Sequence, residues 1–103
     1  MKKVIDGKIY NTETAEQLGS YWNGKSEGDF QYVYEFLYRT KKGRFFLAGE
    51  GGAMSHYCRR CGDNTWCEGK GIIPLEDNEA REWAESHWST EDYIAIFGEP
   101  EEA

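Results

Sequence analysis

The chain has 103 residues, a mass of 11.9 kDa and a formal net charge of −7 at pH 7. This length suits one domain, and an aromatic content of 16% argues against an intrinsically disordered chain. No apolar stretch reaches the roughly 20 residues of a membrane helix, and residues 1–6 lack the apolar core of a signal peptide. We therefore expect a cytoplasmic protein with a single domain at 1–98 and a flexible acidic tail at 99–103.

The N-terminal segment predicts a β-hairpin followed by a short helix. An Asp-Gly pair lies between two short apolar runs in residues 3–10, and this dipeptide readily adopts the left-handed backbone of a two-residue hairpin turn. Asn11 or Thr12 then offers a helix N-cap, and Gly19 offers a stop. These signals predict a helix of about two turns through Leu18.

The most regular pattern in the sequence lies at residues 30–39, where aromatic residues alternate with other side chains. A period of two is typical of a β-strand. Residues 41–43 then form a turn and 44–48 return as the antiparallel partner, so the sequence predicts an aromatic hairpin over 30–49. We expect the aromatic face of this sheet to form the core.

Residues 49–71 are rich in glycine, polar residues and cysteine, which predicts a long loop. Ile72 and Ile73 follow as a short buried strand, which Pro74 closes. The Gly-rich start of this loop lacks the Gly-Lys-Ser/Thr ending of a phosphate-binding loop, so nucleotide binding is not expected.

The C-terminal part of the chain predicts two helices. The apolar spacing of residues 80–87 indicates an amphipathic helix that begins at Glu76 or Asp77, and a second helix follows Ser89 and ends at Gly98. Together the elements predict an α+β fold: an antiparallel sheet with an N-terminal β-hairpin, one short helix and two C-terminal helices.

The loop contains a pattern that could bind zinc through one imidazole and three thiolates, His56, Cys58, Cys61 and Cys67. The pattern lacks the second Cys-x-x-Cys pair of common zinc sites. Free thiols are the default in a reducing cytosol, so we expect no bound metal or other cofactor. A small zinc-stabilised binding or adaptor domain is the alternative interpretation. No complete catalytic constellation is present, and we expect neither enzymatic activity nor a small-molecule substrate.

Charge is distributed unevenly along the chain. Residues 76–103 carry ten carboxylates and a single basic side chain, Arg81, which leaves nine acidic and eleven basic residues before them. Helix N-termini favour some of these carboxylates, but ordinary exposed helices also carry basic partners. The imbalance predicts a protein that binds a basic surface through Glu76, Asp77, Glu79, Glu82, Glu85, Glu91 and Asp92.

Basic residues gather at the tip of the predicted aromatic hairpin, at Arg39, Lys41, Lys42 and Arg44. The simple interpretation is a solvated turn, which the negative net charge favours. A small contact with RNA is the alternative.

Several blocks of the sequence resemble a family of small proteins from prophages and mobile elements of Firmicutes: Val4–Ala15, Glu35–Leu47, Gly49–Ser55, Ile72–Leu75 and Glu79–Trp83. Some members of that family are identified as type II-A anti-CRISPR proteins. The resemblance implies a non-enzymatic inhibitor, acting in a bacterial host cell, that binds Cas9 or another CRISPR effector or its guide-RNA complex. It would block guide loading, DNA binding or cleavage. The three cysteines are not part of the family pattern.

Overall fold

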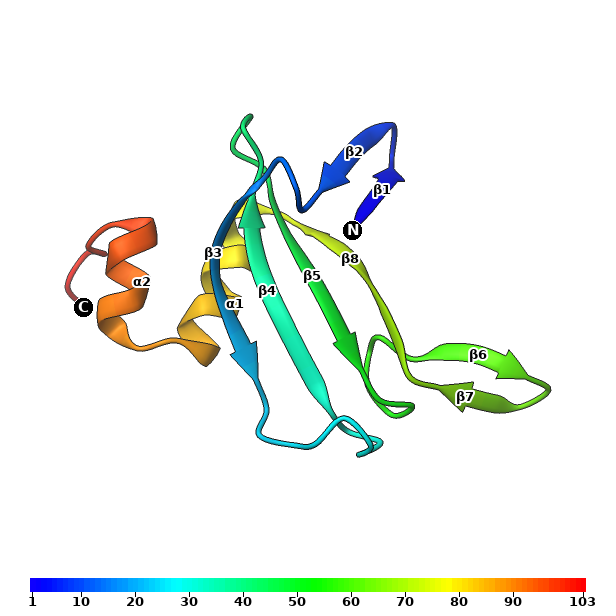
Figure 1. Cartoon of the computed structure of the whole chain (residues 1–103). Helices are drawn as coiled ribbons and strands as arrows, with labels where there is room; N and C mark the ends of the chain where they lie inside the picture. The colour runs from blue at the N-terminus through cyan, green and yellow to red at the C-terminus, as the bar shows by residue number, and fades with distance from the viewer.

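A four-stranded antiparallel sheet forms the centre of the computed structural model, which describes residues 1–103 (Figure 1). Its strands lie side by side in the order β3 (Glu16–Trp22), β4 (Val33–Arg39), β5 (Phe45–Gly51) and β8 (Gly69–Leu75). β4 and β5 pair along their full lengths, so the predicted aromatic hairpin is confirmed. Its first strand begins at Val33 rather than Phe30, because the backbone N–H of Tyr32 closes a turn onto the carbonyl of Asp29.

The predicted N-terminal hairpin is also confirmed, as β1 (Lys2–Ile5) and β2 (Lys8–Asn11). Asp6 and Gly7 have φ angles of 50° and 74°, as a two-residue hairpin turn requires. The hairpin does not join the central sheet. It lies against one face of it, where Tyr10 packs edge-on against Phe46 with ring centroids 5.5 Å apart.

The short helix predicted through Leu18 is wrong. Residues 12–15 form turns, and the chain then enters β3, an edge strand that pairs with β4. The Asn11 side chain accepts a hydrogen bond from the backbone N–H of Glu13 at 3.0 Å, so the group expected to cap a helix closes a tight turn instead.

The long loop predicted at 49–71 is wrong as well, because much of it is extended. β5 continues to Gly51, and β8 begins at Gly69 and contains the short strand expected before Pro74. Between them a separate hairpin, β6 (Arg59–Gly62) and β7 (Thr65–Cys67), projects from the end of the sheet (Figure 1). Pro74 fits inside β8 because β8 is an edge strand.

Both C-terminal helices are confirmed. At the start of α1 (Asp77–His87), the carboxylate of Glu79 accepts the backbone N–H of Glu76 at 2.8 Å. The Ser89 hydroxyl caps α2 (Thr90–Phe97). Neither helix has the length and apolar character that crossing a membrane requires. The overall architecture is the α+β fold expected from the sequence.

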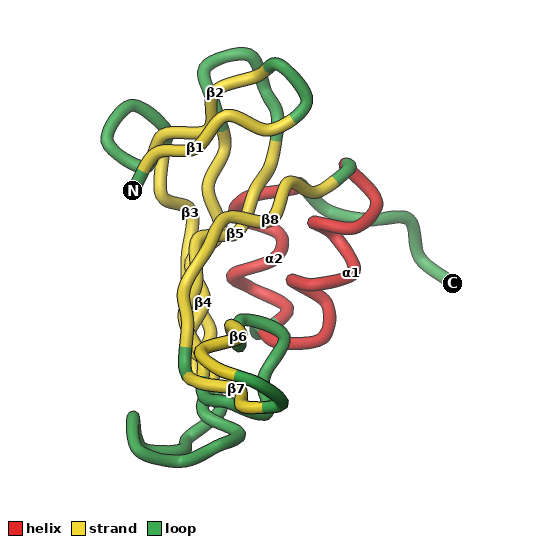
Figure 2. Tube along the Cα trace, turned by 90° about the vertical axis from the view of Figure 1, so that its right-hand side faces the viewer, coloured by secondary structure: helices red, strands yellow, loops and turns green.

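The two helices and the N-terminal hairpin cover opposite faces of the sheet (Figure 2). On the helical side the core contains Leu37, Phe45, Leu47 and Ala80; on the hairpin side it contains Tyr10, Phe46, Ala48 and Ile72. The aromatic face of the sheet, which was expected to form the core, therefore forms one half of it: Phe46 and Ala48 are buried there, and an equally large cluster lies under the helices. The helices cover the face of Leu37, and the aromatic side chains on the other face, Tyr34, Phe36 and Tyr38, stay partly exposed.

Candidate functional site

The seven carboxylates assigned to partner binding lie on the helical layer, and all are exposed: Glu76, Asp77, Glu79, Glu82, Glu85, Glu91 and Asp92. Ala80 and Ala84 are fully buried and define the inward side of α1. Around the helix axis Glu82 and Glu85 lie about 180° and about 120° from this side, so they project from the outward side of the helix. We call these exposed carboxylates of α1 and α2 the acidic helical face.

Only part of this charge is neutralised within the protein. Asp77 accepts a hydrogen bond from Arg81 at 2.8 Å, and Glu79 is engaged at the start of α1. Arg81, the only basic residue of this region, also lies over the Phe97 ring, 5.0 Å from its centroid. The carboxylates that form no ion pair are Glu76, Glu79, Glu82, Glu85, Glu91 and Asp92.

The four basic residues predicted at the hairpin tip do not all stay together. Lys41, Lys42 and Arg44 line a cavity of about 430 Å³ beside the β4–β5 turn. Arg39 points elsewhere and pairs with Glu16 of β3 at 2.9 Å. The predicted group is therefore reduced to three members.

Sequence reasoning missed a fourth cation of this cavity, Lys8, which reaches it from the N-terminal hairpin. The ten lining residues include no carboxylate. The Asp6–Gly7 turn fixes Lys8 at the start of β2, but only the docking of the two hairpins places it in the lining of the same cavity as Lys42. No local sequence signal carries that information. We call this cavity the basic cavity.

The four candidate zinc ligands are not brought together. His56 Nε2 lies 2.9 Å from a carboxylate oxygen of Glu35, and Cys61 forms a disulfide with Cys67. The expectation of three free thiols is wrong, since only Cys58 is free. No group of three or more His, Cys, Asp or Glu side chains that could hold a metal ion is present in the structure.

The disulfide closes the β6–β7 hairpin onto itself. An irregular pairing after Arg60 brings the Cα atoms of Cys61 and Cys67 to 5.9 Å, which suits a disulfide.

Because β6 and β7 contact each other far more than they contact the sheet, we expect reduction of the disulfide by dithiothreitol to shift the melting temperature by less than about 3 °C. Amide exchange should rise in residues 59–67 and stay unchanged in β4. A Cys61→Ser/Cys67→Ser variant should behave as the reduced protein does. The expectation would be contradicted if β4 unfolded more slowly in the oxidised protein than in the reduced protein.

Glu35 is a buried carboxylate in the middle of β4, with 3% of its surface exposed. Its Oε2 accepts a hydrogen bond from the Tyr57 hydroxyl at 2.6 Å and lies 2.9 Å from His56 Nε2. Its Oε1 accepts the indole N–H of Trp83 at 3.0 Å. Tyr57 lies over Gly49, where any larger residue would collide with the ring. Glu35 therefore joins the sheet, the 52–58 loop and α1.

This environment changes two pKa values. Burial raises the pKa of Glu35, but hydrogen bonds from Trp83, Tyr57 and His56, with the charge of His56, outweigh it and lower the pKa below its ordinary 4.5. Burial and the bond to Glu35 raise the pKa of the Tyr57 phenol. Both partners therefore keep their ordinary charge states at neutral pH, and the cluster acts as a structural connection.

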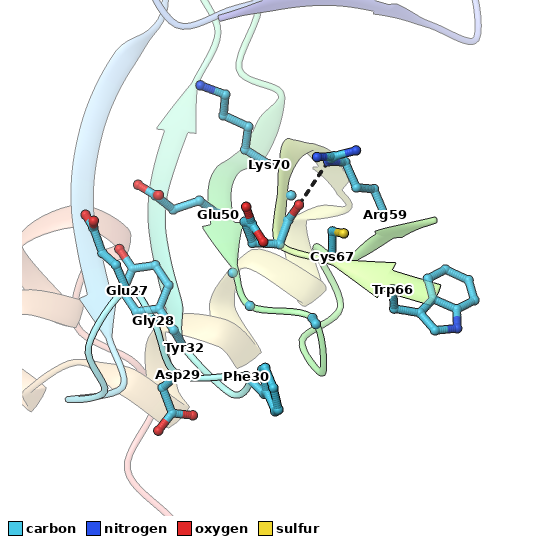
Figure 3. Close-up of a pocket in the computed structure, with 15 residues that line it drawn as sticks. Glu27, Gly28, Asp29, Phe30, Tyr32, Glu50, Arg59, Trp66, Cys67 and Lys70 are labelled. Carbon is cyan, nitrogen blue, oxygen red and sulfur yellow. Dashed lines mark hydrogen bonds between the residues drawn. The ribbon is translucent and has the colours of Figure 1, made fainter. Parts of the chain in front are cut away.

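A further cavity, of about 660 Å³, lies between residues 27–32 and the β6–β7 hairpin (Figure 3). Its rim carries two strongly exposed aromatic residues, Phe30 and Trp66. Arg59 Nε donates to the backbone carbonyl of Glu68 at 3.1 Å, the dashed line in Figure 3. Its charged lining mixes both signs: Glu27, Asp29, Glu50, Glu68, Arg59 and Lys70. Four carboxylates against two cations give this lining a net negative charge, but both signs are present in it.

The acidic helical face carries a single basic residue, Arg81, and the basic cavity carries no carboxylate, so one sign of charge strongly dominates each of them. The sheet lies between the helices and the N-terminal hairpin, so the molecule has two electrically different sides (Figure 2). In comparisons with known proteins, no family model, no curated protein and no solved structure matches the chain.

Proposed function

We propose that the chain is a non-catalytic inhibitor of the anti-CRISPR type, which binds Cas9 or another CRISPR effector through the acidic helical face. The observation that supports it is the set of exposed carboxylates without ion-pair partners on two adjacent helices, above all Glu82, Glu85 and Glu91. The resemblance of several sequence blocks to type II-A anti-CRISPR proteins supports the choice of target.

The physical basis of this proposal is electrostatic complementarity. A CRISPR effector holds its guide–target heteroduplex in a positively charged channel, which a rigid acidic surface can occupy in place of phosphates. The rigidity comes from α1, whose Ala80 and Ala84 are fully buried against the rest of the protein. Charge of this kind speeds association and is screened by salt, so inhibition should weaken as ionic strength rises.

The test is target-DNA cleavage by a purified type II-A Cas9, with the protein added before or after the guide RNA at low and moderate salt. Neutralising three unpaired carboxylates, in Glu82→Gln/Glu85→Gln/Glu91→Gln, should weaken inhibition by about ten-fold or more, because each lost charge reduces attraction to the channel. Inhibition only on early addition indicates competition with guide loading. Inhibition on late addition as well indicates a block of DNA binding or cleavage.

A matched control removes the same number of charges from the C-terminal tail, which has no regular structure, in Glu99→Gln/Glu101→Gln/Glu102→Gln. If this variant loses as much inhibition as the helical variant, net charge rather than the acidic helical face is responsible. No inhibition at large molar excess in either order of addition would refute the proposed target.

A further inference from the structure

The sheet face opposite the helices carries a row of accessible aromatic rings. Tyr34 and Phe36 project from the same side of β4, and their rings stack with centroids 4.8 Å apart and planes 14° apart. Trp22 lies directly opposite Tyr34 in the β3–β4 register, so it shares this face, and 53% of it is exposed. An unpartnered aromatic surface on a sheet is unusual, because burial would stabilise the rings.

A hollow of about 180 Å³ lies over the aromatic rings of β4, and its lining has one charged side chain of each sign. Tyr34, Phe36 and Tyr38 form its aromatic part, and Met1 and Lys70 also line it. The Met1 backbone nitrogen donates to the Thr12 hydroxyl at 2.8 Å, which holds the start of the N-terminal hairpin beside this hollow. Glu50 is the one carboxylate of the lining.

The basic cavity lies beside the same N-terminal hairpin. Tyr10 of the hairpin lines the basic cavity and packs on Phe46, and Phe46 stacks on Tyr38 of the aromatic hollow with centroids 5.1 Å apart. Two consecutive ring contacts, Tyr10 to Phe46 and Phe46 to Tyr38, therefore join the linings of the two hollows, and Phe46 itself is fully buried between them. The hairpin between them adds the exposed cations Lys2 and Lys3.

Turn geometry gives the basic cavity a defined shape. Gly43 has a φ of 85°, and the backbone N–H of Arg44 donates to the Thr40 hydroxyl at 3.1 Å, which fixes the β4–β5 turn. Three cations of this turn face Lys8 around one cavity without a compensating carboxylate. All four of these side chains are exposed, so the cavity presents their positive charge to the solvent, where it attracts anionic ligands.

We propose that this face binds single-stranded nucleic acid. Phosphates lie in the basic cavity, at Lys8, Lys41, Lys42 and Arg44, and unpaired bases stack on the rings of Tyr34 and Phe36. The combination of a cationic groove with aromatic stacking surfaces is the general means of binding single strands, because every base has a face that can stack. A duplex presents phosphates but no free base faces. This activity is separate from the acidic helical face and does not depend on a CRISPR effector.

The experiment measures fluorescence anisotropy of a labelled strand of about 12 nucleotides, as oligo-U, oligo-dT and a duplex of equal length, at increasing salt. Saturable binding of a single strand, tighter than binding of the duplex, is expected. The U and dT arms separate RNA from DNA as the preferred source. In Lys41→Gln/Lys42→Gln the slope of log affinity against log salt should become shallower by about 1.4, which corresponds to two lost phosphate contacts.

Tyr34→Leu keeps an apolar side chain but removes the ring, and it should weaken binding by about ten-fold without changing the salt slope. Arg59→Gln/Arg60→Gln, on the exposed β6–β7 hairpin, removes the same charge as the lysine variant and should leave binding nearly unchanged.

The proposal is overturned if no single strand binds at low salt, if the duplex binds as tightly as the single strand, or if the arginine variant lowers affinity as much as the lysine variant. An unchanged affinity in Tyr34→Leu would overturn the placement of the bases. Glu82→Gln/Glu85→Gln/Glu91→Gln should retain strand binding, which separates this proposal from the inhibitory one.

Discussion

Replacing Glu35 with alanine is expected to lower the free energy of unfolding by about 3–5 kcal/mol. The substitution removes the common acceptor of three groups that come from two different segments: Trp83 of α1 and His56 and Tyr57 of the loop. Tyr57 is buried, so its hydroxyl would lose a hydrogen bond without gaining full access to water. Urea unfolding followed by tryptophan fluorescence measures the loss.

Two further variants test whether the loss of stability comes from the hydrogen bonds of Glu35. Glu35→Gln keeps the shape and one acceptor oxygen, and it should cost about 1–2 kcal/mol because its amide cannot accept from all three donors. Glu50→Gln changes an exposed carboxylate of the neighbouring strand and should cost less than about 0.5 kcal/mol. Equal losses in Glu35→Ala and Glu50→Gln would contradict a structural role for the cluster.

The same residue predicts part of the acid sensitivity. The pKa of Glu35 in the folded protein is below 4.5, because its hydrogen bonds outweigh the cost of burial. Between the folded and unfolded pKa values the unfolded chain binds more protons, so stability rises with pH there. The contribution is complete above about pH 4.5 and is lost as pH falls through the folded pKa. Glu35→Gln should flatten this part of the stability curve.

Local sequence signals correctly predicted the elements whose local conformational preference matches the tertiary contacts that they make in the fold. The Asp-Gly turn, the alternating aromatic run and the caps of both C-terminal helices each depend on residues within a few positions, and each is confirmed. The predicted helix after Asn11 was wrong because its signals were equally suited to a tight turn. The following segment, Glu16–Trp22, is a strand because it pairs with β4, and this tertiary pairing outweighs its local sequence signals.

The candidate sites depended more on long-range contacts. The acidic helical face could be predicted, because helix periodicity alone separates Glu82 and Glu85 from Ala80 and Ala84. The roles of Lys8 and Glu35 could not, because each arises from contact between segments about 20 or more positions apart. In the alternating run Glu35 occupies a position that the sequence predicts to face solvent, and it is buried because both α1 and the 52–58 loop pack over it.

Phe46→Ala is expected to lower the free energy of unfolding by about 3–5 kcal/mol, a large part of the total for a domain of this size. Phe46 is fully buried on the hairpin side of the sheet, between the rings of Tyr10 and Tyr38. Its removal leaves a cavity where the N-terminal hairpin is attached. Hydrogen exchange should therefore show loss of protection in β1 and β2 at denaturant concentrations where β4 is still protected.

Leu37→Ala provides the comparison, because Leu37 is equally buried on the helical side. It should cost about 2–5 kcal/mol but leave the hairpin protected for as long as the sheet is folded. Phe30→Ala is the matched control for the loss of a phenyl ring: Phe30 is 66% exposed, so its removal should change stability by less than about 0.5 kcal/mol.

If Phe46→Ala and Leu37→Ala cause the same segments to lose protection, the sheet has one undivided core and the N-terminal hairpin is not held mainly by Phe46. If only Phe46→Ala releases the hairpin, single-strand binding should weaken in that variant too, since Lys8 would leave the basic cavity.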